Sequence, residues 1–288
     1  MATELINHDA VVQGPVAKPE NLRVAYVLST IVVVLSAATS LIGLLFPVVY
    51  RGNWGGMSLA NDGITLVIVV PTLALAIIYS ARGSLRARLL WLGALFYMLY
   101  NYAFYIFGIS VTKLYVPWIA IFALSAVSVT LIMLNVDVEA IGRAFSPRTP
   151  GRWIAAYLAF AGVMISFLWI SQWLKFVFTG HVPEVNGSQD AYHVIAAVDL
   201  AFAVPMLISS AWLLFRRHPW GYVLGVAATV QFAMYFAVMT AVCVVNWKLT
   251  PGSHLVSDWF INCIITLPLL LLCLAGLLLN MKSKAARS

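Results

Sequence analysis

The sequence predicts an all-α polytopic membrane protein with eight transmembrane helices. Hydrophobic residues make up 62% of the 288 positions, only 9% are charged, and the mean hydropathy is +0.95. Soluble domains carry about 25% charged residues, so this chain has too few polar side chains to cover a globule in water. A helix needs about 20 apolar residues to cross a bilayer. Eight such stretches follow one another, at roughly residues 24–49, 63–80, 88–110, 115–135, 153–177, 192–215, 220–246 and 257–280.

Each stretch is bounded by charged or turn-forming residues, and the connections between them are short. In chain order the bounding residues are Arg23, Arg51, Arg82, Arg88, Lys113, Asn135, Arg152, Arg216, Pro219, Lys248, Asp258 and Lys282. We therefore expect one transmembrane domain over residues 23–281. Residues 1–22 are polar and hold two prolines, so they predict a flexible tail, and residues 282–288 predict a short basic tail.

The lysines and arginines predict the orientation, because cytoplasmic loops carry an excess of both. With the N-terminus inside, four lie on the outer side: Arg51, Lys113, Lys175 and Lys248. The inner side receives thirteen: Lys18, Arg23, Arg82, Arg86, Arg88, Arg143, Arg148, Arg152, Arg216, Arg217, Lys282, Lys284 and Arg287. Both termini are therefore expected in the cytoplasm. The net charge of +7 then reflects membrane orientation, with the lipid bilayer as partner and no nucleic acid.

Two stretches share a pattern that favours an internal duplication. Pro71 and Pro205 lie near their middles, and an arginine follows each proline eleven residues later, at Arg82 and Arg216. Because both stretches run in the same direction, the pattern predicts a parallel repeat of two four-helix halves. The halves would be residues 23–140 and 150–281. The alternative is that prolines and flanking arginines recur in membrane helices without any duplication.

Asp199 is the most informative polar residue, because it lies about 10 Å inside the sixth stretch at 1.5 Å per residue. A charge at that depth is costly and marks a functional site by default. The residue could be protonated, paired or exposed to a wet pocket, and Lys175 is the nearest partner by depth. The alternative is that an Asp199–Lys175 pair, or a bond to a tyrosine, only stabilises helix packing.

Further polar side chains lie on the third and seventh stretches. Tyr97, Tyr100 and Asn101 share one helical face in the segment FYMLYNYAFYIFG, and Gln231 lies near the middle of the seventh stretch. This face must meet protein, since lipid offers Asn101 no hydrogen bond. Near the end of the segment, Tyr105 and Phe107 are expected to anchor the helix at the outer interface.

Other polar residues predict simpler roles. Asp62 and Asp258 are expected to cap helix N-termini. Acidic and histidine side chains of the outer loops, including Glu184, have no metal-type spacing and are expected to face water. The three cysteines predict no disulfide framework. Neither a P-loop nor a His-Glu-x-x-His motif occurs, so no catalytic residue or metal ligand is predicted and the cofactor stays open.

Two segments, RGSLRARLLWLGALFYMLYNY and LLFRRHPWGYVLG, resemble uncharacterised multi-pass bacterial membrane proteins. That resemblance implies a bacterial inner membrane and brings no activity with it.

Three functions remain open. The first is binding or transport of a small molecule or ion in a pocket open to the outer side, built from Asp199, Asn101, Tyr97, Tyr100, Gln231 and Lys175. The second is a structural or accessory subunit of a homo- or hetero-oligomer, in which the small residues Gly221, Gly225 and Ala228 admit a partner helix. The third, which the sequence favours least, is an enzyme acting on a lipid or quinone.

Overall fold

The computed structural model describes residues 22–50, 55–185, 189–249 and 254–282, and these ranges contain helices and no β-strand. The predicted tails fall almost wholly outside them, as does Arg51, and the side chains of His254 and Asp258 are likewise not described. The elements are α1 (Arg23–Leu45), η2 (Pro47–Val49), α2 (Gly55–Ile64), η3 (Thr65–Val69), α3 (Val70–Ala81), α4 (Leu85–Gly108), α5 (Tyr115–Leu134), α6 (Val138–Ala144), α7 (Gly151–Thr179), α8 (Gln189–Val198), η4 (Asp199–Ala203), α9 (Val204–Phe215), α10 (Pro219–Leu249) and α11 (His254–Leu279).

Seven helices of the described chain are long and apolar enough to cross a membrane. They are Arg23–Leu45, Met57–Ala81, Leu85–Gly108, Tyr115–Leu134, Gly151–Thr179, Gln189–Phe215 and Pro219–Val245. In α11 the described apolar part, Cys263–Leu279, is shorter. The fold is therefore all-α, and the chain is a multi-pass membrane protein in which seven spans meet the criteria for crossing.

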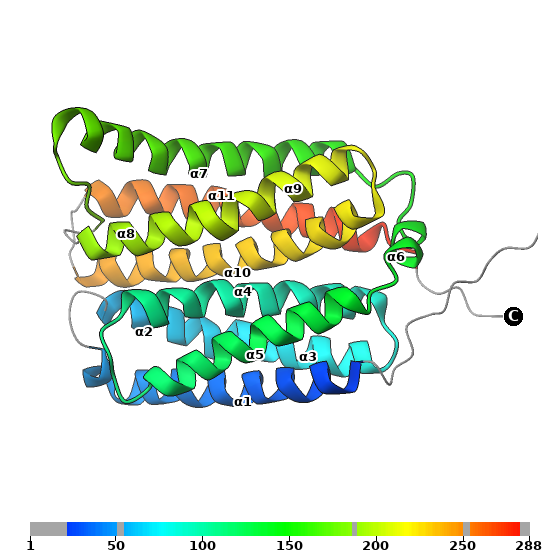
Figure 1. Cartoon of the computed structure of the whole chain (residues 1–288), viewed down its shortest axis with the longest axis horizontal. Coiled ribbons are helices and arrows are strands. Elements are labelled where there is room, and N and C mark those ends of the chain that lie inside the picture. The colour runs from blue at the N-terminus through cyan, green and yellow to red at the C-terminus, as the bar shows by residue number, and fades with distance from the viewer. Residues whose placement is uncertain (1–21, 51–54, 186–188, 250–253, 283–288) are drawn as a thin grey trace, which may run out of the picture.

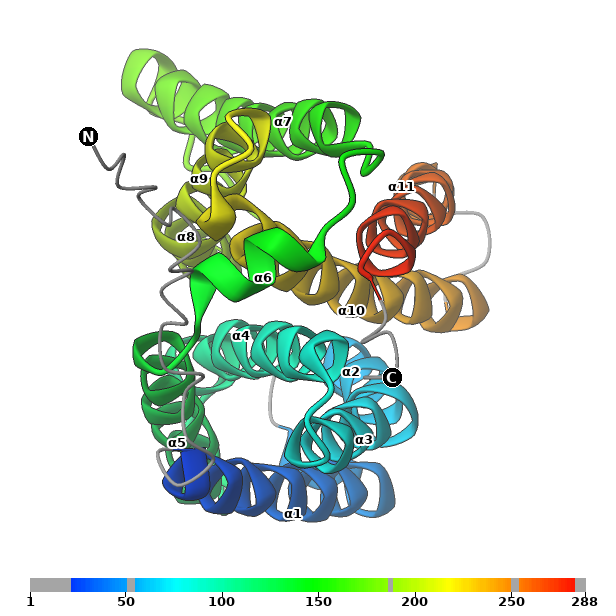
Figure 2. The same cartoon turned by 90° about the vertical axis from the view of Figure 1, so that its right-hand side faces the viewer.

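The helices form two groups that meet at α4 and α10. Figure 2 shows α1 to α5 on one side and α7 to α11 on the other, with α4 and α10 side by side between them. Each of the two central helices also contacts the other group, α4 through α8 and α10 through α2. The start of α1 and the end of α11 lie at the same end of the bundle (Figure 1).

Burial separates the central helices from the peripheral ones. Of the 18 most apolar consecutive residues of α4, 78% are buried, whereas the corresponding share in α7 is 28%. The outward side of α7 carries large apolar side chains, among them Phe160, Phe167 and Trp173, that are more than half exposed. Lipid accommodates such side chains, whereas water would not.

The mid-helix prolines have a specific structural effect. Pro71 and Pro205 each follow a π-helical turn, Thr65–Val69 and Asp199–Ala203. A proline has no N–H and its ring displaces the carbonyl four residues earlier, so the preceding turn widens. The widened turns are closed by bonds over five residues, from Val70 N–H to the Thr65 carbonyl and from Val204 N–H to the Asp199 carbonyl.

The two proline-containing helices agree in every boundary. Helix α2, its π turn and α3 recur as α8, its π turn and α9, with each start and end 134 residues later, so that Thr65 corresponds to Asp199. The agreement continues into the next turn, where Gly83 and Arg217 both have positive φ, 89° and 54°. A positive φ is uncommon for a residue with a side chain, so Arg217 adopts a turn geometry that suits glycine better.

A short helix that the sequence did not predict, α6, connects the two groups. Asp137 caps it by accepting a hydrogen bond from the Ala140 N–H at 2.9 Å. The end of α6 lies beside the residues that follow α11, where Lys282 N–H donates to the Ala144 carbonyl at 2.7 Å. This packing ties the end of the second group to the connection between the groups.

Candidate ligand-binding site

Helix α4 carries the predicted polar face, and the structure confirms that this face meets protein. Tyr97, Tyr100, Asn101, Tyr102 and Tyr105 are all buried, none more than 4% exposed. Because successive residues of a helix point in different directions, these side chains reach different neighbours. Four of them enter three polar clusters, and the Tyr102 hydroxyl lies 3.4 Å from Thr39 Oγ1.

The first cluster surrounds Asp199. This residue begins the π turn after α8, eleven positions into a 27-residue span, and is 6% exposed. The Tyr100 hydroxyl donates to Oδ1, and the Trp169 indole Nε1–H donates to Oδ2 at 2.8 Å. Tyr192 positions Trp169 in turn. The Tyr192 hydroxyl donates to the Trp169 carbonyl oxygen at 3.3 Å, and the centroids of the two side-chain rings are 5.6 Å apart. The carboxylate is thus fixed by two neutral donors from α4 and α7.

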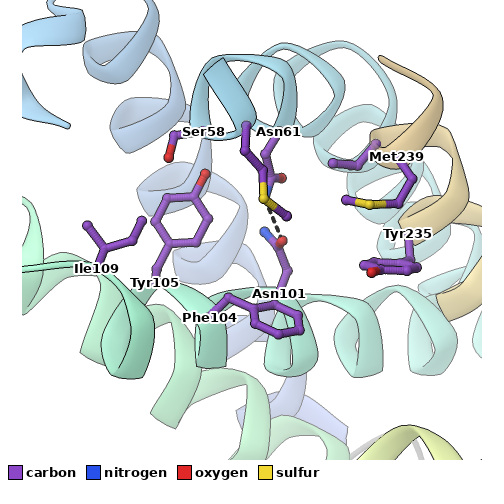
Figure 3. A pocket seen from close by; sticks show the side chains of 10 residues that line it. Ser58, Asn61, Asn101, Phe104, Tyr105, Ile109, Tyr235 and Met239 are labelled. Atoms are coloured by element: carbon purple, nitrogen blue, oxygen red, sulfur yellow. Dashed lines mark hydrogen bonds between the residues drawn. The ribbon is translucent and has the colours of Figure 1, made fainter. Parts of the chain in front are cut away.

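The second cluster joins α2 to α4 around Asn61. Its amide Nδ2–H donates to Asn101 Oδ1 at 2.7 Å, as the dashed line in Figure 3 marks. Its Oδ1 accepts from Tyr97 at 3.3 Å and from Thr65 at 3.2 Å. A cavity of about 20 Å³ borders this cluster, lined by Ser58, Asn61, Asn101 and Tyr105 among others (Figure 3). That volume holds about one water molecule.

The third cluster surrounds Asp62, which is 3% exposed. The Tyr50 hydroxyl donates to Oδ2, and the Tyr105 hydroxyl donates to Oδ1 at 3.3 Å. Burial and the neighbouring Asp62 carboxylate raise the pKa of the Tyr50 phenol, which keeps this phenol a donor. Gly43 makes room for the pair, since a Cβ there would overlap both Asp62 and Tyr50. The cluster is closed by its own side chains.

A large cavity opens beside the first cluster. Its volume is about 410 Å³, within the range of about 300–1,000 Å³ of small-molecule sites. It lies between α4, α7, α8 and α10, and its lining residues are Met57, Tyr100, Ile165, Leu168, Trp169, Gln172, Glu184, Val185, Ile195, Asp199, Phe232, Tyr235, Phe236, Met239, Val242 and Cys243. Glu184 is exposed in the link between α7 and α8, so the cavity reaches that end of the bundle.

The six residues predicted for the site divide between these features. Asp199 and Tyr100 line the large cavity, whereas Asn101 lines the small one and Tyr97 supports it through Asn61. Lys175 is exposed near the end of α7 and lines neither cavity. Gln231 is 2% exposed on α10, outside both linings, and its Oε1 has no hydrogen-bond partner among the described residues. The structure therefore brings together Asp199 and Tyr100 and leaves Lys175 apart.

Three expectations differ from the structure. Asp62 lies in the last turns of α2, bonded by tyrosines, and does not cap a helix start. Tyr105 is buried on Asp62 and does not anchor the helix in the interface, whereas Phe107 is 66% exposed and its role as an anchor stays a prediction. Gly221 and Gly225 pack against Leu214 of α9, and Ala228 is buried, so these small residues serve packing within the chain.

Sequence reasoning missed Asn61 and Trp169. Asn61 precedes the apolar run, so the span predicted at 63–80 excludes it. Trp169 lies three residues before Gln172, on the same face of α7, and that spacing was the available signal.

Nothing in the described residues builds a metal centre. They contain no group of three or more His, Cys, Asp or Glu side chains that converge on one point. The arrangement can instead hold a molecule against one buried carboxylate and an aromatic wall.

Fold and site together define a multi-pass helical membrane protein with an acidic internal cavity. No protein-family model, curated protein or solved structure matches the chain.

Proposed function

We propose that the protein crosses a bacterial inner membrane eight times, with both termini in the cytoplasm. α11 packs along α10 beside the seven apolar spans, and an even number of crossings agrees with α1 starting and α11 ending at one end of the bundle (Figure 1). The excess of lysine and arginine at that end supports its cytoplasmic position. The cavity rim at Glu184 would then face outward.

We also propose that residues 23–140 and 150–281 are duplicated halves. The common boundaries at a constant offset of 134 residues support this, as do the matching π turns and the reciprocal contacts of α4 with α8 and of α10 with α2. Prolines alone would not reproduce the lengths of the three elements from α2 to α3 in those from α8 to α9.

For the function itself, we propose binding of a small molecule in the 410 Å³ cavity, as the site of a transporter or receptor. The observation that carries this proposal is a buried carboxylate, Asp199, on the wall of a cavity that reaches one end of the bundle. Membrane proteins keep intramembrane charges where they face a pathway or a ligand. The large cavity distinguishes this carboxylate from Asp62, whose cluster is closed.

A purely structural role is the second candidate, because both oxygens of Asp199 already accept bonds from the protein. In that case the cavity would exclude water and solutes. The small-residue face expected to admit a partner helix is buried within the chain, which removes its main support.

Cys243 provides a test, because it lines the large cavity while Cys263 is buried outside that lining. In nanodiscs, we expect 2-hydroxyethyl methanethiosulfonate, a small polar thiol reagent, to modify Cys243 about tenfold faster than Cys263, since thiol reactivity follows access. Single-cysteine variants, Cys263→Ser with Cys273→Ser and Cys243→Ser with Cys273→Ser, allow mass spectrometry to follow each thiol. Equally slow reaction of both thiols would contradict the binding function and support the structural one.

A further inference from the structure

The lining of the large cavity has one sign of charge. Its acidic side chains are Glu184 at the rim and Asp199 in the interior. The described residues that line the cavity include no lysine, arginine or histidine. A cleft lined by one sign of charge concentrates ligands of the opposite sign.

Asp199 retains the capacity to bind a cation. An ionised carboxylate has about four lone-pair positions, and protein donors occupy one on each oxygen of Asp199. Tyr100 and Trp169 are neutral, so their bonds orient the carboxylate without compensating its charge. A cationic ligand would supply that compensation in a medium where an unpaired charge is expensive.

Aromatic rings form much of the remaining wall. Tyr100, Trp169, Phe232, Tyr235 and Phe236 all line the cavity. The faces of such rings attract ammonium groups, and tryptophan does so most strongly. Tyr100 and Tyr235 meet edge to face, with centroids 5.3 Å apart at 87°, so the two rings present differently oriented surfaces.

The same features disfavour other ligands. A bare metal ion needs several oxygen, nitrogen or sulfur ligands at one point, and the described residues offer no such group. An anion would meet two carboxylates without a basic partner. The cavity is also far larger than a single ion requires, and most of its lining is apolar.

From these observations we propose that the cavity binds an organic monocation, an ammonium group attached to an apolar body, with Asp199 as its counter-ion. This assignment rests on the proposed binding function. The ammonium group lies at Asp199 between the aromatic rings, and the apolar body lies against Ile165, Leu168 and Met239. Glu184 at the rim attracts the cation as it enters.

Among the described residues, the positions of the first half that correspond to this site do not form an equivalent one. At the offset of 134 residues, Asn61 corresponds to Ile195, Thr65 to Asp199 and Asn101 to Tyr235. In the first half these positions are joined by hydrogen bonds and border a cavity of about 20 Å³, too small for an organic molecule. We therefore expect one cation per chain.

Protection of Cys243 tests the proposal in the single-cysteine protein in nanodiscs. The probes are benzyltrimethylammonium, the uncharged N-benzylacetamide and the anionic benzenesulfonate, each added before 2-hydroxyethyl methanethiosulfonate. We expect benzyltrimethylammonium alone to slow the modification. Asp199→Asn should raise the concentration needed for half-protection about tenfold or more, the effect expected on removing one partner of a buried charge pair. Asp62→Asn, the matched change at the closed cluster, should leave it unchanged.

A second measurement needs no change at Asp199. The permanently cationic 2-(trimethylammonium)ethyl methanethiosulfonate should modify Cys243 about tenfold faster than the anionic 2-sulfonatoethyl reagent, because the acidic cavity concentrates cations. Equal protection by all three probes, or equal rates with both reagents, would overturn the cation assignment while leaving small-molecule binding intact. An unreactive Cys243 would overturn the binding function itself.

Discussion

A Gly93→Ala variant is expected to unfold at a lower temperature than the wild-type protein, and Gly93→Leu at a lower temperature still. Gly93 lies on α4 where it faces α10. A Cβ at this position would stand 2.6 Å from Val230 Cβ and 3.0 Å from the Ala227 carbonyl oxygen. Neither atom is the free end of a flexible side chain, so the helices themselves must separate. Overpacking of this kind costs about 1–3 kcal/mol.

Gly63→Ala is the matched control, because it makes the same change in a helix where no atom lies within 4 Å of the new Cβ. Alanine favours a helix over glycine by about 1 kcal/mol, a gain that both variants share. The two midpoints of thermal unfolding, followed in detergent by tryptophan fluorescence, therefore isolate the contact between the helices. A Gly93→Ala midpoint equal to that of Gly63→Ala would show that α4 and α10 do not approach so closely.

Removal of both hydrogen-bond donors from Asp199 is the second large expected effect. The double variant Tyr100→Phe with Trp169→Phe keeps the aromatic rings but leaves a buried carboxylate without a protein donor. Hydrogen bonds to charged groups contribute about 1.5–3 kcal/mol each, so we expect a loss of stability of about 3 kcal/mol or more. Thermal unfolding in detergent measures it.

Adding Asp199→Leu to that double variant should recover most of the lost stability, because a side chain without charge needs no donors. Such a recovery means that the stability changes of the substitutions do not add. It would show that the double variant lost stability through the carboxylate without donors and not through lost packing. Tyr79→Phe with Trp173→Phe provides the control, since both of those side chains are about half exposed. If the donor-deficient protein were as stable as this control, Asp199 would not depend on Tyr100 and Trp169.

The helix ends illustrate how much of the fold the sequence predicts. The stretch expected at 115–135 is α5, Tyr115–Leu134, and the one expected at 153–177 is α7, Gly151–Thr179. Both hold long apolar runs bounded by polar or charged residues, Lys113 and Asn135 for the first and Arg152 and Lys175 for the second, and the cost of placing such groups in lipid determines these ends locally. The span expected at 63–80 instead begins at Met57, because its first residues are polar and are buried among protein side chains.

The candidate site was predictable in part. The sequence shows that polar partners are required by Asn101, Tyr97 and Tyr100, because these residues lie within an apolar run. Their partners do not follow, because partner choice depends on which helices are neighbours and how each is rotated about its axis. The sequence allowed a bond between Asp199 and a tyrosine, which the structure shows to be Tyr100, but it did not indicate Asn61 as the partner of Asn101.

By itself the sequence determined the class of protein, most of the membrane-spanning stretches and the position of a costly intramembrane carboxylate. These follow from the free energy of transferring apolar and charged groups into lipid, which each segment obeys largely on its own. Only the tertiary structure decided that Asp199 is held by Tyr100 and Trp169 and borders a large cavity, whereas Asp62 is enclosed by tyrosines. The sequence separated the two aspartates only by their expected depth, whereas the packing of neighbouring helices places Asp199 on the wall of the large cavity and Asp62 outside its lining.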